Sequence, residues 1–487
     1  MPDSTDSPSS TSEAPKSPPP TGPEAAPRSV MGRLFDPQAP VSPKKFPFFY
    51  GWLIVPMAAF GLLASMPGQT IGVGSFTPHL LETLRMEDES ELTLAYMIGT
   101  ICSGLLLPFV GRRIDKVGVR QVGVLVFICF GFVLLFMASL GYILDTLDNA
   151  DNPSPSIAFT LVLVGYFFLR FLGQGVVSIL PGLMIQRWFN RLRGRVAGIF
   201  NATVALGFSS SPLVLDFIIE IFGPTGAWVF LGCVMIFVMA SLAYLFYRDS
   251  PEQCGLEMDG GWAPKKPDTA KTAARFHTYH DFTALEAVRT LPFWFFAIGL
   301  GFQSFTITAI FFHRKEMVGE MGITNDDFGS MLIGAACANI CMNLVIGWMT
   351  ERVALRNVLG IMLAGTCTLM AGVLTFPSNW GYVLWILGSG MSWASYGVLN
   401  NVTWPRYYGR AHLGSINGIF MSTLVFASAL GPHYYSLIFQ TEGAYLAAIK
   451  YSFIWPVAIL CLFPFIQNPQ RKYMPPEVAG DVPPPKA

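Results

Sequence analysis

The most regular feature of the chain is a series of apolar stretches, each about 20 residues long, separated by short polar loops. Because about 20 helical residues cross the hydrocarbon core of a bilayer, each stretch predicts a membrane-spanning helix. Pro67 and Gly68 interrupt the first stretch and predict a bend there. The stretches are 50–80, 93–111, 121–144, 157–186, 195–219, 226–247, 291–313, 327–350, 356–376, 379–404, 413–439 and 443–466. The pattern predicts an all-α membrane protein with twelve transmembrane helices.

Polar segments divide this series into two groups of six spans. Residues 1–47 are rich in Pro and Ser and predict a disordered tail, and residues 467–487 form a second polar tail. Residues 248–290 form a polar linker between two six-helix bundles, 48–247 and 291–466. Within the linker, Phe282, Leu285 and Val288 have helical spacing, which predicts a short amphipathic helix on the membrane surface.

Composition agrees with a membrane protein and excludes a soluble enzyme. The chain is 52% hydrophobic and 13% charged, whereas a soluble domain is about 25% charged. A soluble protein with so much exposed apolar surface would aggregate. The formal net charge of +0 says nothing about partners, and the chain has no basic segment interleaved with aromatic residues of the kind that would predict a nucleic-acid surface.

The loops predict the orientation. Cations are concentrated in the loops at one side of the predicted bundle, which indicates the cytoplasmic side, and both termini fall on that side. Arg85 and the pair Arg314-Lys315 are exceptions. We therefore expect a multi-pass protein of the cell membrane (the inner membrane in a bacterium). The cations that carry this prediction are Lys44, Lys45, Arg112, Arg113, Lys116, Arg120, the 187–195 cluster, Arg352, Arg356, Arg406 and Arg410.

The two groups of spans are also similar in sequence. Two stretches of the first half, which begin at Gly111 and at Gln186, recur in the second half in the same order. Parallel repeats with the same topology imply a pseudo-two-fold axis along the membrane normal and a binding site between the halves at mid-depth. The matched residues are Gly111 with Gly347, Asp115 with Glu351, Lys116 with Arg352, Arg120 with Arg356, Gly194 with Gly414, Gly198 with Gly418 and Pro212 with Pro432.

A single cation, Arg170, lies inside the fourth apolar stretch. It precedes Arg187 by 17 residues, or about 25 Å of helix, which places it deep in the hydrocarbon. An arginine there costs at least ~2.5 kcal/mol unless it faces water or a counter-ion. Arg170 could therefore bind an anion, with Gln174 one turn away on the same face. Alternatively, it pairs with a neighbouring helix or with backbone carbonyls and holds the bundle together.

The first repeated stretch resembles the signature of the major facilitator superfamily. It contains Gly111, Asp115, Lys116, Gly118 and Arg120 in the spacing found between the second and third spans of these transporters. The resemblance implies the major facilitator fold, with the two six-helix pseudo-symmetric bundles described above. Within the superfamily, the chain resembles the bacterial monocarboxylate and oxalate/formate transporter-like group, through Tyr50-Gly51-Trp52, Arg187-Trp188-Phe189 and Ser250 to Gly255.

The resemblance also implies which spans line the substrate path. In this fold the first, fourth, seventh and tenth spans face the central cavity. The polar residues that they contribute, besides Arg170 and Gln174, are Gln69, Thr70, Gln303, Ser304, Ser392, Trp393, Tyr396 and Asn400. Each of them could instead form a hydrogen bond between helices. Span eight carries no charge and span eleven offers His433 but no lysine, so carboxylate specificity does not transfer residue by residue.

The signature loop predicts a gate. Asp115 lies near a helix end, where it can pair with an arginine or with a helix N-terminus. Breaking that pair as the halves rock would set the balance between inward- and outward-open states. The other interpretation is a tight turn whose charges only orient the spans. The candidate gating residues are Gly111, Asp115, Lys116, Gly118, Arg120, Glu351 and Arg352.

Proton coupling requires a titratable group in the path. Asp216 and His433 occupy nearly equivalent repeat positions, just after Pro212 and Pro432. A histidine near neutrality could sense pH. Both residues lie toward the outer ends of their spans, so solvation alone also explains them.

Together these features predict a secondary transporter of a small organic anion, a monocarboxylate, coupled to protons or to exchange. The alternatives are an exporter of a neutral or cationic compound, or a membrane sensor that uses the 248–290 linker. No P-loop, no nucleophile with a base and no metal-binding cysteine spacing is visible, so we expect neither an enzyme nor a cofactor or metal site. The expected partners are a small-molecule substrate, the lipid bilayer and protons, but no nucleic acid, and we expect a monomer.

Overall fold

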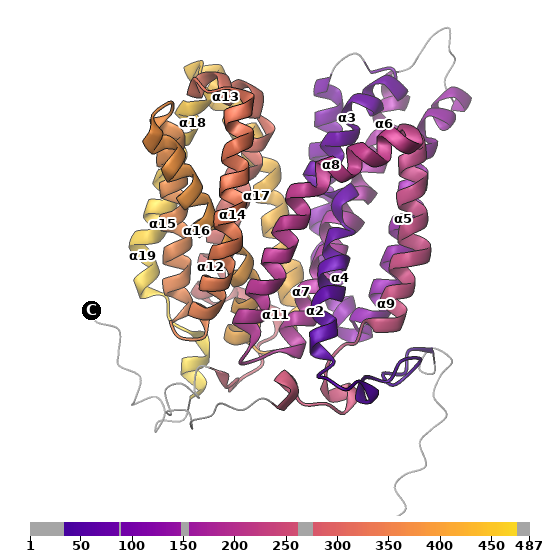
Figure 1. The fold of residues 1–487 in the computed structure, drawn as a ribbon, viewed down its shortest axis with the longest axis vertical. Helices are drawn as coiled ribbons and strands as arrows, with labels where there is room; N and C mark the ends of the chain where they lie inside the picture. The colour runs from indigo at the N-terminus through magenta and orange to yellow at the C-terminus, as the bar shows by residue number, and fades with distance from the viewer. Residues whose placement is uncertain (1–33, 87–88, 148–154, 262–275, 475–487) are drawn as a thin grey trace, which may run out of the picture.

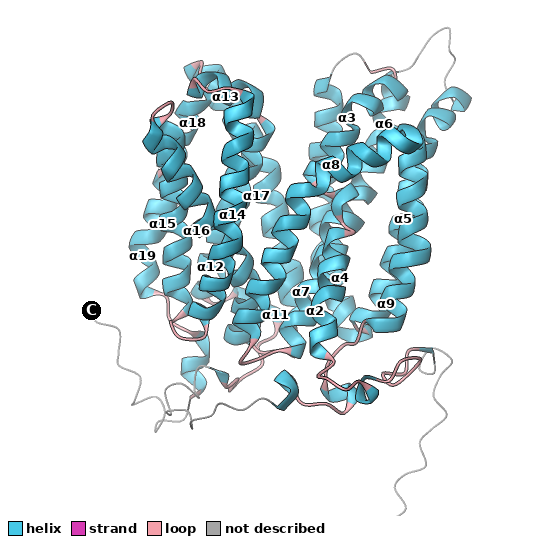
Figure 2. Cartoon of the chain, viewed as in Figure 1, coloured by secondary structure: helices cyan, strands magenta, loops and turns pink. Residues whose placement is uncertain are grey.

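The computed structural model describes residues 34–86, 89–147, 155–261 and 276–474. These residues form helices and connecting loops only (Figure 2). Within these ranges, ten helical stretches are long and apolar enough to cross a membrane. One of them, Arg193–Phe246, supplies two crossings, because the chain turns at Gly223 (φ 71°) just before Pro224. Adding α16 (Asn379–Tyr408), a 30-residue helix that is not among these ten stretches, brings the count in the described residues to the predicted twelve.

The first half contains six crossings. The first of them is α2 with α3, and the short 3-10 turn Met66–Gly68 between these helices confirms the predicted bend. The helices are α2 (Gly51–Leu63), α3 (Thr70–Thr83), α4 (Glu89–Val117), α5 (Val119–Leu147), α6 (Pro155–Leu169) with the π-helical segment Arg170–Val177 and α7 (Ser178–Trp188), and α8 (Arg193–Cys233) with the π-helical segment Val234–Met239 and α9 (Ala240–Phe246).

The second half contains the other six crossings. Its helices are α12 (Leu291–Phe312), α13 (Arg314–Met321), α14 (Asn325–Thr350), α15 (Leu355–Thr375), α16 (Asn379–Tyr408), α17 (Leu413–Glu442), α18 (Tyr445–Ser452) and α19 (Ile454–Leu462). The largest error in the predicted spans is at the end of α4, predicted at 111 and observed at 117. Apolar length therefore predicts these helices well, because each must match the same hydrocarbon thickness.

The two halves lie side by side, and both described chain ends lie at the same end of the bundle (Figure 1). We call this the tail end and the opposite one the far end. The halves meet through α4 against α17 and α8 against α14, and their ribbons diverge toward the far end (Figure 1). In the described part of the chain, the hydrogen bonds and ion pairs that join the halves run from Ser422 Oγ–Gly104 O, near mid-depth, to the tail end.

The N-terminal segment corrects one prediction. Residues 34–47, which we predicted to be part of a disordered tail, lie against the tail end of the first half. Arg120 donates to the carbonyl oxygens of Asp36 (2.9 Å) and Ala39 (2.7 Å). Arg248 donates to the carbonyls of Pro37 (2.9 Å) and Val41 (2.8 Å). Two buried guanidinium groups therefore fix a segment whose composition alone suggested disorder. Residues 1–33 lie outside the described part of the chain.

The linker contains the predicted short helix, but the buried Phe282 beside it packs on protein. The predicted amphipathic helix is present as α11 (Ala284–Val288), which starts with a capping box between Thr283 and Glu286. Phe282 is buried and packs edge-on against Tyr408 and Tyr473, so it contacts protein.

This anchoring gives a stability prediction. Arg248→Ala should destabilise the protein by roughly 2–3 kcal/mol, because the variant leaves several buried carbonyl groups without their charged donor. Thermal unfolding of purified protein followed by tryptophan fluorescence measures the effect. Arg289→Ala, at an exposed linker position, is the control and should melt like the unmodified protein. Equal melting of both variants would contradict the anchoring.

Candidate functional site

Asp115 holds the start of α17 at the tail end of the structure. Its carboxylate accepts hydrogen bonds from the backbone N–H groups of Gly414 and Ser415, each at 2.7 Å, and from the Ser415 hydroxyl at 2.7 Å. Arg187 Nη2 approaches the same carboxylate at 3.1 Å. The Asp115 side chain is only 9% exposed. A carboxylate at a helix N-terminus is stabilised by the free N–H groups and the helix dipole, so this acid joins the two halves of the protein.

Glu351 forms the corresponding contact in the other direction. It lies at the end of α14, and its carboxylate accepts from the backbone N–H of Arg195 (3.3 Å) and pairs with the Arg195 side chain (2.9 Å) at the start of α8. The sequence repeat matches Asp115 with Glu351. Each half therefore extends an acid to the N-terminus of a helix in the other half, as a pseudo-two-fold axis requires. We call these two contacts the crossed caps.

Glycines permit the close approach that the crossed caps need. A Cβ atom on Gly414 would lie 2.5 Å from the Gly111 carbonyl oxygen. A Cβ atom on Gly347 would lie 2.5 Å from the carbonyl oxygen of Gly194. The repeat matches Gly111 with Gly347 and Gly194 with Gly414, so both crossings use the same small-residue packing.

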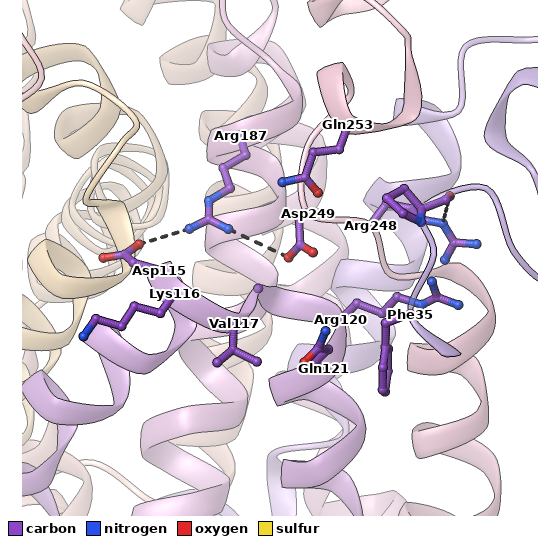
Figure 3. Close-up of a pocket in the computed structure, with 12 residues that line it drawn as sticks. Phe35, Asp115, Lys116, Val117, Arg120, Gln121, Arg187, Arg248, Asp249 and Gln253 are labelled. Carbon is purple, nitrogen blue, oxygen red and sulfur yellow. Dashed lines mark hydrogen bonds and ion pairs between the residues drawn. The ribbon is translucent and has the colours of Figure 1, made fainter. Parts of the chain in front are cut away.

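Arg187 links Asp115 to a second, partly buried acid, Asp249 (Figure 3). Its Nη1 lies 3.9 Å from Asp249 Oδ1. Asp249 also accepts a hydrogen bond from the backbone N–H of Val119, at the start of α5, beside the turn at Gly118 (φ 99°). These groups line a polar cavity of about 220 Å³ together with Lys116 and Arg120. Burial raises the pKa of the Asp249 carboxyl, against the opposing charge of Arg187.

A pair of amides continues the contact between halves toward mid-depth. Gln186 on α7 and Asn417 on α17 donate to each other's carbonyl oxygens, at 3.3 and 3.0 Å, and both are buried. Gln186 Nε2 also lies 3.3 Å from the backbone oxygen of Asn400. We did not single out Gln186 or Asn417 from the sequence. The signal was available, because Asn417 follows Gly414 by three residues, on the helix face that meets the other half.

The remaining candidate gating residues lie beside the crossed caps. Arg120 binds the N-terminal segment and the Tyr244 carbonyl, all in the first half. Arg352 is exposed and stacks on Trp348 at 4.0 Å. Lys116 is exposed at the mouth of the polar cavity. Among the predicted set, the structure thus brings Gly111, Asp115 and Glu351 into contact with the opposite half.

Arg170 lies at the start of a π-helical segment of the fourth crossing and is 1% exposed. Its Nη1 donates to the Gly68 carbonyl (2.9 Å), at the bend of the first crossing, and its Nε donates to Thr100 Oγ1 (3.1 Å). The guanidinium carbon lies 4.7 Å from the centre of the Tyr96 ring. Nη2 is buried without a hydrogen-bond partner in the described residues. Each of these partners belongs to the first half and none carries a charge.

The polar neighbours of Arg170 form one cluster. Gln69 donates to Ser65 and Ser178, each at 2.9 Å, and Thr70 shares a hydrogen bond with Tyr96 at 2.9 Å. The side-chain oxygen of Gln174 is buried and lacks a partner in the described residues. The bend at residues 66–68 makes this cluster possible, because it releases a backbone carbonyl that Arg170 can reach.

The candidate residues of the second half form a separate cluster. Gln303 Oε1 accepts from Thr366 (2.8 Å) and from Ser392 (2.6 Å) inside that half. Ser304 lies 3.4 Å from the Leu424 carbonyl, and the buried indole N–H of Trp393 has no partner among the described residues. Tyr396 is partly buried on the same helix, α16. No hydrogen bond in the described residues joins this cluster to the Arg170 cluster, so in this conformation the predicted substrate ligands lie in two groups.

Asp216 and His433, the predicted proton-coupling residues, are both exposed. The buried histidine of the second half is His313, whose Nε2 lies 3.0 Å from the Pro432 carbonyl and whose ring stacks on Tyr445.

The crossed caps predict a local effect of Asp115→Asn. The variant keeps the shape of the side chain but loses its charge at the α17 N-terminus, so tail-end closure should weaken by about 1–2 kcal/mol. Hydrogen–deuterium exchange should become faster in peptides that cover 107–117 and 413–418. Asp326→Asn, an exposed acid in the first turn of α14, is the matched control. Unchanged exchange at 413–418 would refute the role of Asp115.

Asp249 gives a prediction for pH dependence. Because burial raises its pKa, the folded protein binds this proton more tightly than the unfolded chain. The contribution of Asp249 to stability is therefore largest at low pH and is lost as the pH rises through the folded pKa. The Asp249→Asn variant has no carboxyl group here and does not lose this stability. The melting temperature of the variant minus that of the unmodified protein should therefore be larger at pH 7 than at pH 4. The opposite trend would show that the carboxylate form stabilises the fold.

The family model described as Major Facilitator Superfamily matches residues 58–432. No protein with a curated function matches the chain in sequence. A bacterial homologue of the iron transporter ferroportin, in an outward-facing state, is similar in structure with a TM-score of 0.62 and 15% identity over 84% of this chain and 98% of that chain.

Two further structures show the same fold. A proton:xylose symporter of this superfamily, bound to a halogenated glucose, has a TM-score of 0.59 and 15% identity over 85% of this chain and 95% of its own. A human organic anion transporter has a TM-score of 0.51 and 14% identity over 84% and 97% of the two chains. At these identities the similarities establish the fold and leave the substrate open.

Proposed function

The chain belongs to the major facilitator superfamily, and from this membership we propose that it is a secondary active transporter of a small organic anion. We place it in the monocarboxylate and oxalate/formate transporter-like group, with a monocarboxylate as substrate. Transport would proceed by alternating access, coupled to protons or to exchange. The protein would act as a monomer in the cell membrane, without catalysis or a cofactor.

The main support for this proposal is the burial of Arg170 without an ion pair in the described residues. Its guanidinium is buried among neutral groups, and the described residues supply it with no ion pair. An uncompensated buried cation costs several kcal/mol, and its remaining N–H donors are strong sites for a carboxylate. The unpartnered Nη2 of Arg170 supplies such a donor. A bound anion would neutralise the charge and complete the hydrogen bonding.

The conformation fits this scheme. The halves contact each other through the crossed caps at the tail end, while the hydrogen bonds and ion pairs between halves in the described residues stop near mid-depth. We propose that the tail end faces the cytoplasm, as the loop charges predict, so that this conformation is closed to the cytoplasm. Opening at the tail end would then have to break both crossed caps and the Gln186–Asn417 pair.

A second candidate function has its own support. Arg170 is almost fully buried, and its contacts with Gly68, Thr100 and Tyr96 join the fourth crossing to the first and second crossings. These contacts would suffice for a structural arginine in an exporter of neutral or cationic compounds. In that case, removing the charge would lower stability and would not change which solutes are transported.

One transport experiment distinguishes the two candidate functions. Arg170→Gln should lower anion uptake by about 30- to 100-fold in proteoliposomes, because a charged donor to the substrate is lost. Arg170→Lys should retain part of the uptake. The assay uses radiolabelled monocarboxylates, dicarboxylates, phosphate and a neutral sugar, each with and without a pH gradient.

Arg85→Gln, which removes an exposed cation paired with Asp145 at the far end, is the control and should transport normally. The melting temperature and gel-filtration profile of each variant verify folding. Full anion uptake by well-folded Arg170→Gln protein would exclude the anion-carrier proposal.

A further inference from the structure

The linker between the two halves contacts both of them at the tail end. Asp259 is 8% exposed, and its carboxylate accepts from the backbone N–H groups of the loop that joins α7 to α8, in the first half: Asn190, Arg191 and Leu192, at 2.9–3.3 Å. Asp281 accepts from the N–H groups of Arg410 (2.7 Å) and Ala411 (3.3 Å), in the loop that joins α16 to α17. The sequence repeat matches these two loops, so each linker acid binds the same element of a different half.

Phe276 lies between the α7–α8 loop of the first half and the end of α16 in the second half. Its ring centre is 5.5 Å from the guanidinium carbon of Arg191, in the first half, and 5.2 Å from that of Arg406, on α16 of the second half. Asn190 donates from its side chain to the Phe276 carbonyl at 3.1 Å, which fixes the backbone beside the ring. One aromatic ring therefore contacts a cation from each half.

This arrangement depends on the distance between the halves. Within about 6 Å a guanidinium is attracted to the ring face, and the attraction is stronger away from water. If the tail ends separated, Phe276 would keep at most one of its two cations. The contact therefore favours the closed conformation over the open one, which is the requirement for any group that shifts a conformational equilibrium.

We propose that Phe276 acts as a clip: the ring bridges Arg191 and Arg406 and holds the tail end closed, with Asp259 and Asp281 positioning the linker on either side. The clip adds to the crossed caps, because it joins Arg191 to Arg406, and neither residue forms part of a cap. The inference rests on the rocking motion in the proposed function but not on the nature of the substrate. Losing one bridging contact should raise the ratio of open to closed molecules by about 3- to 10-fold.

The test measures opening of the tail end without substrate. Asn401, which is 3% exposed and lies close to Gly182 of the opposite half, is changed to cysteine in a variant whose eight native cysteines are replaced by serine or alanine. The reporter cysteine becomes accessible when the tail end opens, so its reaction rate with a bulky polar maleimide reports the open population. Purified full-length protein in detergent is used.

Phe276→Ala should raise the labelling rate by about 3- to 10-fold. Phe276→Leu, which keeps the apolar bulk but has no ring, should raise it to a similar extent, and Phe276→Trp should leave it unchanged or lower it. Phe282→Ala is the matched control, because its ring contacts His280 of the linker and Tyr408 and Tyr473 of the second half, and these contacts do not bridge the two halves. Its labelling rate should equal that of the reporter protein.

Asp115→Asn in the same reporter protein separates the clip from the proposed function. If Asp115→Asn raises the labelling rate while Phe276→Ala and Phe276→Leu do not, the clip is wrong and alternating access stands. If no variant raises the labelling rate, both the proposed opening of the tail end and the clip are contradicted. An equal rise in Phe282→Ala and Phe276→Ala would also overturn the clip, because any damage to the linker would then open the tail end.

Discussion

Two carboxylates, Asp115 and Glu351, each accept a backbone N–H at the first turn of a helix that belongs to the opposite half of the protein. The first turn of a helix has free N–H groups and a partial positive charge, and within protein both are attracted strongly to an acid. The contact between the halves at the tail end is built around this attraction. Since it requires the helices to approach closely, it also explains the glycines at positions 111, 194, 347 and 414.

The other contacts at this end depend on the crossed caps or add to them. Arg187 connects Asp115 to Asp249, and Asp249 accepts from the N–H at the start of α5. The cap that Asp115 forms is therefore also joined to α5. The caps hold the helix ends together, the Gln186–Asn417 pair extends the contact toward mid-depth, and the linker spans the loops on the tail-end surface. A conformational change at this end must break several charge-assisted contacts together, which favours two discrete states over a continuous range.

The sequence predicted the parts of this arrangement that depend on local or repeated patterns. Apolar length gave the twelve crossings, and the repeat paired Asp115 with Glu351. Long-range partners could not be predicted. Nothing near Arg120 in the sequence indicates that it binds carbonyl groups of residues 36 and 39, which made that segment look disordered. For His433 the sequence left proton coupling and solvation both open, because a position within a span does not show which direction the side chain faces. Arg170 was correctly placed within a span, but the sequence could not show that its partners are the Gly68 carbonyl and Thr100.

The central claim is that the two halves form one closed end at a time. Pairs of spin labels test it most directly: Arg113 with Ala354 near the tail end, and Thr146 with Thr441 near the far end, all at exposed positions. Distances are measured by double electron–electron resonance in liposomes across a range of pH and of added monocarboxylate. We expect two populations, in which the tail-end distance lengthens as the far-end distance shortens. A single fixed distance at both ends under every condition would contradict the account.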